Sequence, residues 1–196
     1  MLECVIDFET RSTVSLKETG PFVYAQHPAT EVICLSFEDP ATGEIHRWEP
    51  IRLQQPVPQR LVELVADEAV TFIAHNAIFE QAVWEFIMVR RWGMKRLDIR
   101  RWIDTMAIAA HRGLPLGLEK AGNVLELPEV KDMAGNALLN KVSQPRKIYK
   151  RERRAMETRG EDPTITRFHE DDETLRRVGE YCDQDVRVER ALREAL

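Results

Sequence analysis

Three short acidic motifs lie far apart in this chain, and each falls in or beside a segment that predicts regular secondary structure. They are Asp7-Phe8-Glu9, the run from His75 to Glu80, and the run from Tyr181 to Asp185. The first two lie at the ends of apolar segments with the composition of strands, and the third has helical periodicity. Strands and helices must combine in one fold for these carboxylates to meet, which favours the α/β class.

The rest of the pattern agrees with a single α/β domain of 196 residues. Strands are expected over residues 2–8, 31–38, 44–48 and 70–74. Helices are expected over residues 58–67, 77–92, 103–112 and 116–125, and from residue 171 onward. Residues 141–168 are polar and basic and contain two prolines, which predicts a long and partly mobile loop.

The bulk composition is that of a soluble enzyme domain. Hydrophobic residues make up 43% of the chain and charged residues 31%, which argues against disorder. The cysteines are odd in number and lack metal-binding spacing, so we expect buried, reduced thiols and a cytoplasmic location; they are Cys4, Cys34 and Cys182. No apolar run approaches the roughly 18–20 residues that span a bilayer, and an expected strand directly follows Met1, so we expect neither a membrane partner nor a signal peptide.

The net charge of −5 does not exclude a nucleic-acid partner, because carboxylates that bind cations count as negative while they work beside phosphates. Basic residues gather in two clusters, residues 90–101 and 141–160. Such clusters can neutralise phosphates, although each one alone is equally compatible with a solvated surface. Within the second cluster, Lys141, Arg146 and Lys147 are the predicted contacts to the phosphates of a bound strand.

In the first motif, Asp7 and Glu9 lie two residues apart at the end of a predicted strand. Their side chains therefore leave the same face of the sheet, while Phe8 points to the other face. Two hard oxygen donors side by side suit Mg²⁺ or Mn²⁺. Taken alone, an Asp-x-Glu pair is more often two solvated acids at a strand end, so the pair gains meaning from the other motifs.

The second motif opens a helix directly after a strand. Asn76 is the better predicted N-cap, with His75 as the alternative. Glu80 lies about one turn inside the helix, where a carboxylate also gains from the helix dipole. In isolation, these residues read as a cap and a surface acid. As part of the set, Glu80 is the predicted fourth acid; Asp104 is the reserve candidate, although a helix N-cap explains Asp104 better.

The third motif places Tyr181 and Asp185 four residues apart, hence on one face of the predicted helix. Asp185 can complete a metal site, and a phenol one turn away can hydrogen-bond an attacking water. Four carboxylates from three segments can hold two divalent cations, a common device for cutting phosphodiester bonds. The sequence therefore predicts a metal-dependent nuclease whose catalytic residues are Asp7, Glu9, Glu80, Tyr181 and Asp185.

This ordered set resembles the DnaQ-like 3′–5′ exonucleases of the ribonuclease H-like superfamily, in the DEDDy subgroup with a tyrosine in its last motif. The surrounding segments, residues 7–12, 24–32, 131–139 and 141–146, are similar to the proofreading exonuclease domain of phage-type family A DNA polymerases. The resemblance covers nearly the whole chain. It implies a ribonuclease H-like fold, with a mixed β-sheet flanked by α-helices and a first strand that carries Asp7 and Glu9.

The resemblance also implies a mechanism with two Mg²⁺ or Mn²⁺ ions. Asp7, Glu9 and Asp185 would bind the more tightly held ion, and Glu80 would help to place the other. Tyr181 would orient the nucleophilic water, and hydrolysis would release a 5′-mononucleotide from the 3′ end of DNA. The family usually has Asp where this chain has Glu80, and the longer side chain predicts weaker or Mn²⁺-favouring activity.

The remaining predicted contacts concern the terminal nucleotide of a single-stranded 3′ end. Phe8, Thr10 and Asn76 are the expected contacts, by stacking and hydrogen bonding. Two alternatives to a DNA exonuclease stay open: a weakened module that only binds DNA or a polymerase, and an exoribonuclease with the same chemistry. Residues 1–196 would be a single exonuclease domain, either the N-terminal fragment of a longer polymerase or a separate protein that serves one in trans, encoded by a phage or prophage.

Overall fold

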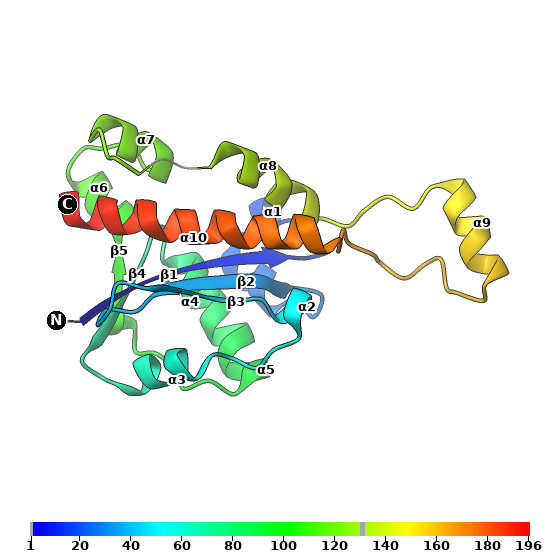
Figure 1. The fold of residues 1–196 in the computed structure, drawn as a ribbon, viewed down its shortest axis with the longest axis horizontal. Coiled ribbons are helices and arrows are strands. Elements are labelled where there is room, and N and C mark those ends of the chain that lie inside the picture. Colours follow the sequence, from blue (N-terminus) through cyan, green and yellow to red (C-terminus); the bar gives the residue numbers. More distant parts are fainter. Residues whose placement is uncertain (1, 130–131) are drawn as a thin grey trace.

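The central strand of the sheet is β1 (Leu2–Arg11), the strand that carries Asp7 and Glu9. In the computed structural model, which describes residues 2–129 and 132–196, β1 pairs antiparallel with β2 (Glu31–Glu38) and parallel with β4 (Val70–Ala74). β3 (Ile45–Trp48) adds antiparallel to β2, and β5 (Trp102–Asp104) adds parallel to β4. The strand order β3-β2-β1-β4-β5 is a mixed sheet, which confirms the predicted α/β class (Figure 1).

Helices cover both faces of this sheet (Figure 1). The long C-terminal helix α10 (Asp172–Ala195) lies along one face, with α7 (Leu118–Val124) and α8 (Met133–Val142) packed against it. The other face is covered by α3 (Gln59–Ala66) and by a continuous helical run of three parts: α4 (Ile78–Val83), the π-helix Trp84–Val89 and α5 (Arg90–Trp92). The predicted helix 77–92 is therefore present, with a π-helical centre.

The two faces of the sheet around β1 pack into different hydrophobic clusters. Ile6 and Phe8 point into the larger core, where they meet Phe72 and Trp84 below the sheet. Cys34 of β2 faces the other way and packs with Cys182 and neighbouring residues of α10. Because side chains alternate along a strand, Asp7 and Glu9 share the α10 face with Cys34, as the sequence predicts. All three cysteines are buried and none forms a disulfide, which confirms the predicted core positions.

Several elements were not predicted from the sequence. β1 continues beyond Phe8 to Arg11, with an irregular pairing to β2 between Glu9 and Thr10. A kink at Gly20, where φ is +74°, interrupts the periodicity of α1 (Leu16–Gln26). The other unpredicted elements are short or lie outside the periodic segments: α2 (Pro50–Leu53), the 3₁₀ turn Ile99–Arg101, β5 and α8. Predicted helix 103–112 starts later, as α6 (Thr105–His111).

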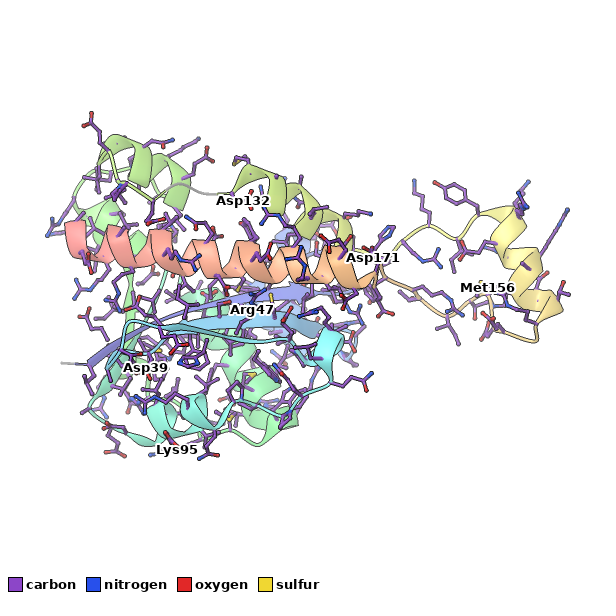
Figure 2. All side chains as sticks on the ribbon, in the orientation of Figure 1. Asp39, Arg47, Lys95, Asp132, Met156 and Asp171 are labelled. Atoms are coloured by element: carbon purple, nitrogen blue, oxygen red, sulfur yellow. The ribbon has the colours of Figure 1, made fainter. Side chains whose placement is uncertain are left out.

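Residues 146–167 form a projection, called here the basic arm, that stands away from the body of the molecule (Figure 1). The sequence predicts a loop here, and that prediction is wrong for its centre, which is the helix α9 (Lys150–Thr158). Met156 is the buried side chain of α9 and faces the inside of the arm (Figure 2). With a single buried apolar residue, α9 lacks the repeating apolar pattern from which a helix is recognised in a sequence.

Ion pairs and backbone hydrogen bonds close the basic arm at its base. The backbone N–H of Arg146 donates to the carbonyl of Arg167 at 2.9 Å, and the Arg146 guanidinium pairs with Glu152. Arg167 and Arg159 both pair with Glu161, at 3.1 and 2.6 Å. The arm is therefore a closed hairpin whose two ends return to the body side by side.

The base of the arm is fastened to the end of β1. Arg11 pairs with Glu170 at 2.7 Å and lies 4.5 Å from the ring centre of Phe168. On the other side, the backbone N–H of Ser12 donates to the carbonyl of Ser143 at 3.1 Å. The base of the arm therefore lies against the end of β1, only a few residues from Asp7 and Glu9.

Candidate active site

The structure brings together three of the four predicted metal-binding acids in one group. Asp7 and Glu9 from β1 and Asp185 from α10 each offer a carboxylate oxygen, and these oxygens lie within 4.8 Å of one another. Mg²⁺ binds oxygen at about 2.1 Å, so one ion bridges oxygens up to about 4.2 Å apart. A small side-chain movement would therefore close all three carboxylates on one ion.

The position of Asp7 depends on contacts on both faces of β1. Phe8, which is 2% exposed, packs edge-on against Trp84 with ring centres 6.3 Å apart and anchors the strand from below. From above, the Cys182 thiol lies 3.2 Å from Asp7 Oδ2 and 3.4 Å from the Asp7 carbonyl, in position to donate a hydrogen bond. Strand and helix are thus held together at the point where the acids meet. The burial of Phe8 favours packing over the predicted base stacking.

Tyr181 lies in the same place, one helical turn before Asp185. Its side chain is 2% exposed, and its hydroxyl donates a hydrogen bond to the Asp185 carboxylate. Burial raises the pKa of the Tyr181 phenol far above its ordinary value, and the charges of Asp185, Glu9 and Asp7 raise it further. The phenol therefore stays protonated and cannot serve as a base, but its oxygen can accept a hydrogen bond from a water molecule.

Helix α8 reaches this tyrosine through Gly135. A Cβ added at Gly135 would lie 2.6 Å from the Cβ of Tyr181 and 2.9 Å from Asp132 Oδ2, so a larger residue would push the two helices apart. Asp132, labelled in Figure 2, caps α8 by accepting from the N–H groups of Ala134 and Gly135, both at 3.0 Å, and it pairs with Arg177 of α10. Part of segment 131–139 thus seats α8 on α10 at Tyr181; Lys131 lies outside the described residues.

Glu80, the fourth predicted acid, lies in the first turn of α4 and is 4% exposed. Burial raises the pKa of its carboxyl well above the ordinary value, and the charge of Asp7, with a smaller effect from Asp104, raises it further. Glu80 lies outside the group of Asp7, Glu9 and Asp185. Its Oε2 atom is buried and has no hydrogen-bond partner in the described part of the chain. This placement suits a second cation beside the first.

A fifth acid, Glu189, was missed from the sequence. It lies on α10 one turn after Asp185, is 3% exposed, and accepts a hydrogen bond from the backbone N–H of His75. Burial raises the pKa of its carboxyl well above the ordinary value, with further effects from Asp7, Glu80 and Asp185. The signal that could have revealed it is spacing, because Tyr181, Asp185 and Glu189 follow one another in steps of four residues.

These five carboxylates, called here the acidic centre, are Asp7, Glu9, Glu80, Asp185 and Glu189. Neither Glu80 nor Glu189 forms an ion pair within residues 2–129 and 132–196, and each has one buried carboxylate oxygen, Oε2, without a hydrogen-bond partner there. Ionised carboxylates out of water cost several kcal/mol each unless a counter-charge offsets them. A set of hard oxygen donors in this state fits a pair of Mg²⁺ or Mn²⁺ ions.

The reserve candidate, Asp104, has another role. Its Oδ1 accepts from Met106 N at 2.9 Å and Ala107 N at 3.4 Å, which makes it the N-cap of α6. The same oxygen accepts from the backbone N–H of Asn76 at 3.0 Å. These contacts favour the capping interpretation over a direct metal ligand.

The prediction that Asn76 or His75 caps α4 is wrong. The helix begins after Ala77 without a side-chain cap, and exposed Asn76 adopts φ +70°, a left-handed conformation that asparagine tolerates. His75 instead contacts the Thr105 hydroxyl at 3.0 Å and the Leu116 carbonyl at 2.7 Å. The loop therefore serves to tie α4 to the neighbouring segments.

A groove of about 740 Å³ runs from the acidic centre to the base of the basic arm. It is bordered by Glu9 and Thr10 of β1, by α1 with Tyr24, and by the residues that follow α8 as far as Pro145. The Thr10 and Tyr24 hydroxyls lie 3.0 Å apart within it. Thr10 thus lies where a nucleotide contact was predicted, whereas Phe8 borders the groove from a buried position and Asn76 is not among the lining residues.

The three predicted phosphate contacts differ in their availability. Lys141, in the last turn of α8, and Lys147, at the start of the arm, are exposed. Arg146 is held in its pair with Glu152. Further along the arm, the exposed cations without an ion pair to any described carboxylate are Lys147, Lys150, Arg151, Arg153 and Arg154. The arm therefore offers a larger cationic surface than the three residues that the sequence predicts.

Comparison with known proteins supports the fold and the family resemblance that the sequence motifs indicate. No protein-family model matches the chain. The chain is 28% identical over 197 residues to the DNA polymerase of Bacillus phage SP02, a match that covers 97% of this chain and 27% of the polymerase's length. This similarity confirms the resemblance to phage-type DNA polymerases drawn from the motifs.

A solved structure described as the apo form of the nuclease matches with a TM-score of 0.52 at 17% identity, over 98% of this chain and 70% of that one. NrnC of Brucella melitensis has a TM-score of 0.47 at 14% identity, over 100% of this chain and 74% of its own. The fold is the ribonuclease H-like α/β fold that the resemblance implied. Within the described residues, none of the helices combines the length and apolar composition of a bilayer span.

Proposed function

We propose that this protein is a divalent-metal-dependent 3′–5′ exonuclease that removes 5′-mononucleotides from the 3′ ends of DNA. The observation that carries the proposal is the convergence of Asp7, Glu9 and Asp185 within 4.8 Å, with Tyr181 hydrogen-bonded to Asp185. The similarity to a phage DNA polymerase makes DNA the preferred substrate and proofreading the preferred role.

In this proposal, Asp7, Glu9 and Asp185 hold the tighter ion and Glu80 helps to hold the second. When bound, the ions would supply activation of a water molecule and stabilisation of the charge that builds on the phosphate and the leaving 3′ oxygen. The Tyr181 oxygen accepts a hydrogen bond from that water while its own O–H donates to the Asp185 carboxylate, and this pair of hydrogen bonds sets the direction of attack. The water oxygen bonds to phosphorus as it gives up a proton to solvent, and the P–O3′ bond breaks as the leaving O3′ takes up a proton from solvent, leaving a 5′-mononucleotide and a new 3′-hydroxyl.

The groove gives the substrate a direction. With the terminal nucleotide next to Glu9 and Thr10, the strand runs past Ser143 and Pro145 towards the basic arm. The exposed cations of the arm then meet phosphates on the 5′ side of the cleaved nucleotide, and exposed Lys141 adds to them. Such contacts hold the strand without reading its sequence. We propose that the 3′ end enters as a single strand, since a groove of about 740 Å³ has room for few nucleotides.

Residues 1–196 would act as one exonuclease domain in the cytoplasm, joined to a polymerase domain or serving one in trans. The match to 27% of the SP02 polymerase's length supports this partner. It also agrees with an origin in a phage or prophage.

The proposal is tested with a 5′-labelled DNA oligonucleotide that has a free 3′ end, incubated with Mg²⁺, with Mn²⁺ and with EDTA. The expected result is a ladder that shortens from the 3′ end and disappears with EDTA and with Asp7→Ala. An RNA oligonucleotide of the same sequence is run in parallel, and faster loss of RNA would favour the exoribonuclease. Intact DNA with both metals, together with a mobility shift, would favour a module that only binds.

A further inference from the structure

Helix α10 presents three polar groups to the acidic centre, one on each of three successive turns: Tyr181, Asp185 and Glu189. The first two were expected from the sequence and have roles in the proposed reaction. Glu189 has none so far, although it is one of the most buried charged side chains of the described residues at 3% exposure.

The carboxylate of Glu189 is only partly hydrogen-bonded. The carboxylate accepts a hydrogen bond from the backbone N–H of His75, at the end of β4, which fixes its orientation. Its Oε2 atom is buried and has no hydrogen-bond partner within the described residues. A buried acid with a purely structural role would be hydrogen-bonded on both oxygens or open to water, and Glu189 of α10 is neither within the described residues.

The surroundings of Glu189 are acidic. The charges that act on it most strongly belong to Asp7, Glu80 and Asp185, which come from β1, α4 and α10. No arginine, lysine or histidine forms an ion pair with it in the part of the chain that the structure describes. A second buried acceptor without a partner, Glu80 Oε2, lies in the same centre. Two such buried acceptors among like charges are suited to bind a cation.

We propose that Glu189 is a fifth acidic ligand of the metal centre and that it serves the ion held by Glu80. The inference rests on the proposed function only for the presence of the ions. It gives the second ion two carboxylates on long side chains, Glu80 and Glu189, in addition to any oxygen shared from Asp7. The His75 N–H then acts as the group that orients this ligand, as outer hydrogen bonds commonly do at metal sites.

The test uses Glu189→Gln, because the amide oxygen of glutamine can still accept from His75 while the charge is removed. Binding of Mn²⁺ is measured by isothermal titration calorimetry and by electron paramagnetic resonance on the intact chain without DNA. We expect two ions in the unmodified protein. In Glu189→Gln, the dissociation constant of the weaker ion should rise about 10–100-fold, and the tighter ion should bind as before. The thermal midpoint in EDTA should be equal or higher, since one buried charge is gone.

Two further variants serve as the control and as the comparison for this measurement. Glu194→Gln, an exposed acid on the same helix, should leave both binding constants unchanged. Glu80→Gln should weaken the same ion, and the double variant should add little to either single change, because both residues serve one site. Unchanged Mn²⁺ binding in Glu189→Gln would overturn the proposal. Equal weakening of both ions, or a lower thermal midpoint in EDTA, would also overturn it, since Glu189 would then support the fold.

Failure of this inference can be separated from failure of the proposed function. If the unmodified protein degrades DNA and Glu189→Gln binds two ions normally, the ligand assignment is wrong and the exonuclease stands. If the unmodified protein leaves DNA and RNA intact but Glu189→Gln loses the weaker ion, the ligand assignment stands and the nuclease proposal is wrong.

Discussion

The acidic centre and the basic arm both concentrate charge of one sign, but the charge of the centre is buried and negative whereas that of the arm is exposed and positive. In the acidic centre the carboxylates of Glu80 and Glu189 are buried, and neither forms an ion pair with a described residue. In the arm the cations are exposed, and about half of the arginines are already paired within the arm, as in Arg146 with Glu152. The centre is therefore suited to bind small cations from solution, whereas the arm has exposed cations suited to an anionic partner.

The difference also concerns stability. The acidic centre lies where β1 packs against α10, and this burial restricts the movement of its side chains before any ion binds. The arm has one buried apolar side chain, Met156 (Figure 2), and its other contacts are mainly ion pairs on the surface. Surface pairs contribute little to stability, about 0–1 kcal/mol each. In the proposed exonuclease, the reaction would take place in the well-packed region and the strand would be held by the arm, which has few buried contacts.

The largest expected effect comes from removing one charge of the acidic centre with Asp7→Asn. Loss of a ligand shared by the proposed ions should lower the rate of nucleotide release at least about 10³-fold, because metal coordination supplies several kcal/mol of transition-state stabilisation. The thermal midpoint in EDTA should not fall, since repulsion is relieved. Single-turnover assays with labelled DNA measure the rate, with Glu194→Gln as the control. Retention of a tenth of the activity would contradict the site.

Tyr181→Phe is the next largest. Removing the hydroxyl takes away the acceptor for the attacking water but no metal ligand, so kcat should fall about 10²-fold while Mn²⁺ binding stays the same. The measurement pairs kinetics at saturating DNA with calorimetry. Equal losses in catalysis and in metal affinity would mean that Tyr181 acts by holding Asp185 in place and does not orient water.

Gly135→Ala tests the close packing of α8 against Tyr181 without removing any catalytic group. The added methyl would meet the Tyr181 Cβ at 2.6 Å, so α8 or the tyrosine must move. We expect a loss of about 1–3 kcal/mol in the free energy of unfolding, as for other overpacked sites, together with slower catalysis. Chemical denaturation measures the stability change. The matched control is Gly117→Ala, at a position with φ −78° and no atom within 4 Å of an added Cβ; if both variants were equally stable, the close approach of α8 would be in doubt.

The smallest effects are expected in the basic arm. Lys147→Ala and Arg151→Ala should each weaken DNA binding modestly and reduce the slope of log affinity against log salt by about 1, with kcat at saturating DNA unchanged. Fluorescence anisotropy with Ca²⁺ in place of Mg²⁺ measures binding across salt concentrations. Lys120→Ala, an exposed cation on α7, is the control. A slope unaffected by the arm variants would assign the arm to another partner.

Much of the acidic centre could be predicted from local periodicity. A strand repeats every two residues and a helix about every four, so Asp7 and Glu9 had to share a face, as did Tyr181 and Asp185. These are properties of the backbone, and tertiary contacts do not change them. The same holds for β2 and β4, whose apolar composition predicted their bounds without error.

Other features depended on contacts between distant segments. Phe8 is a core residue because Trp84 lies beneath it, and Gly135 is required because Tyr181 packs against it. The basic arm contains a helix with too few apolar residues to show a pattern. Asn76 has the side chain of a helix cap, yet the loop turns through a left-handed conformation and α4 begins one residue later.

By itself, the sequence determined which side chains share a face of a strand or helix and which chemistry those side chains can perform. Only the tertiary structure decided which acids enter the acidic centre. Glu189 repeats the spacing of Tyr181 and Asp185, but its spacing is equally compatible with an exposed acid. It is buried because α10 packs across β1 and the backbone of His75 meets it there. Burial is a property of the surroundings of a side chain, and those surroundings come from segments more than a hundred residues away.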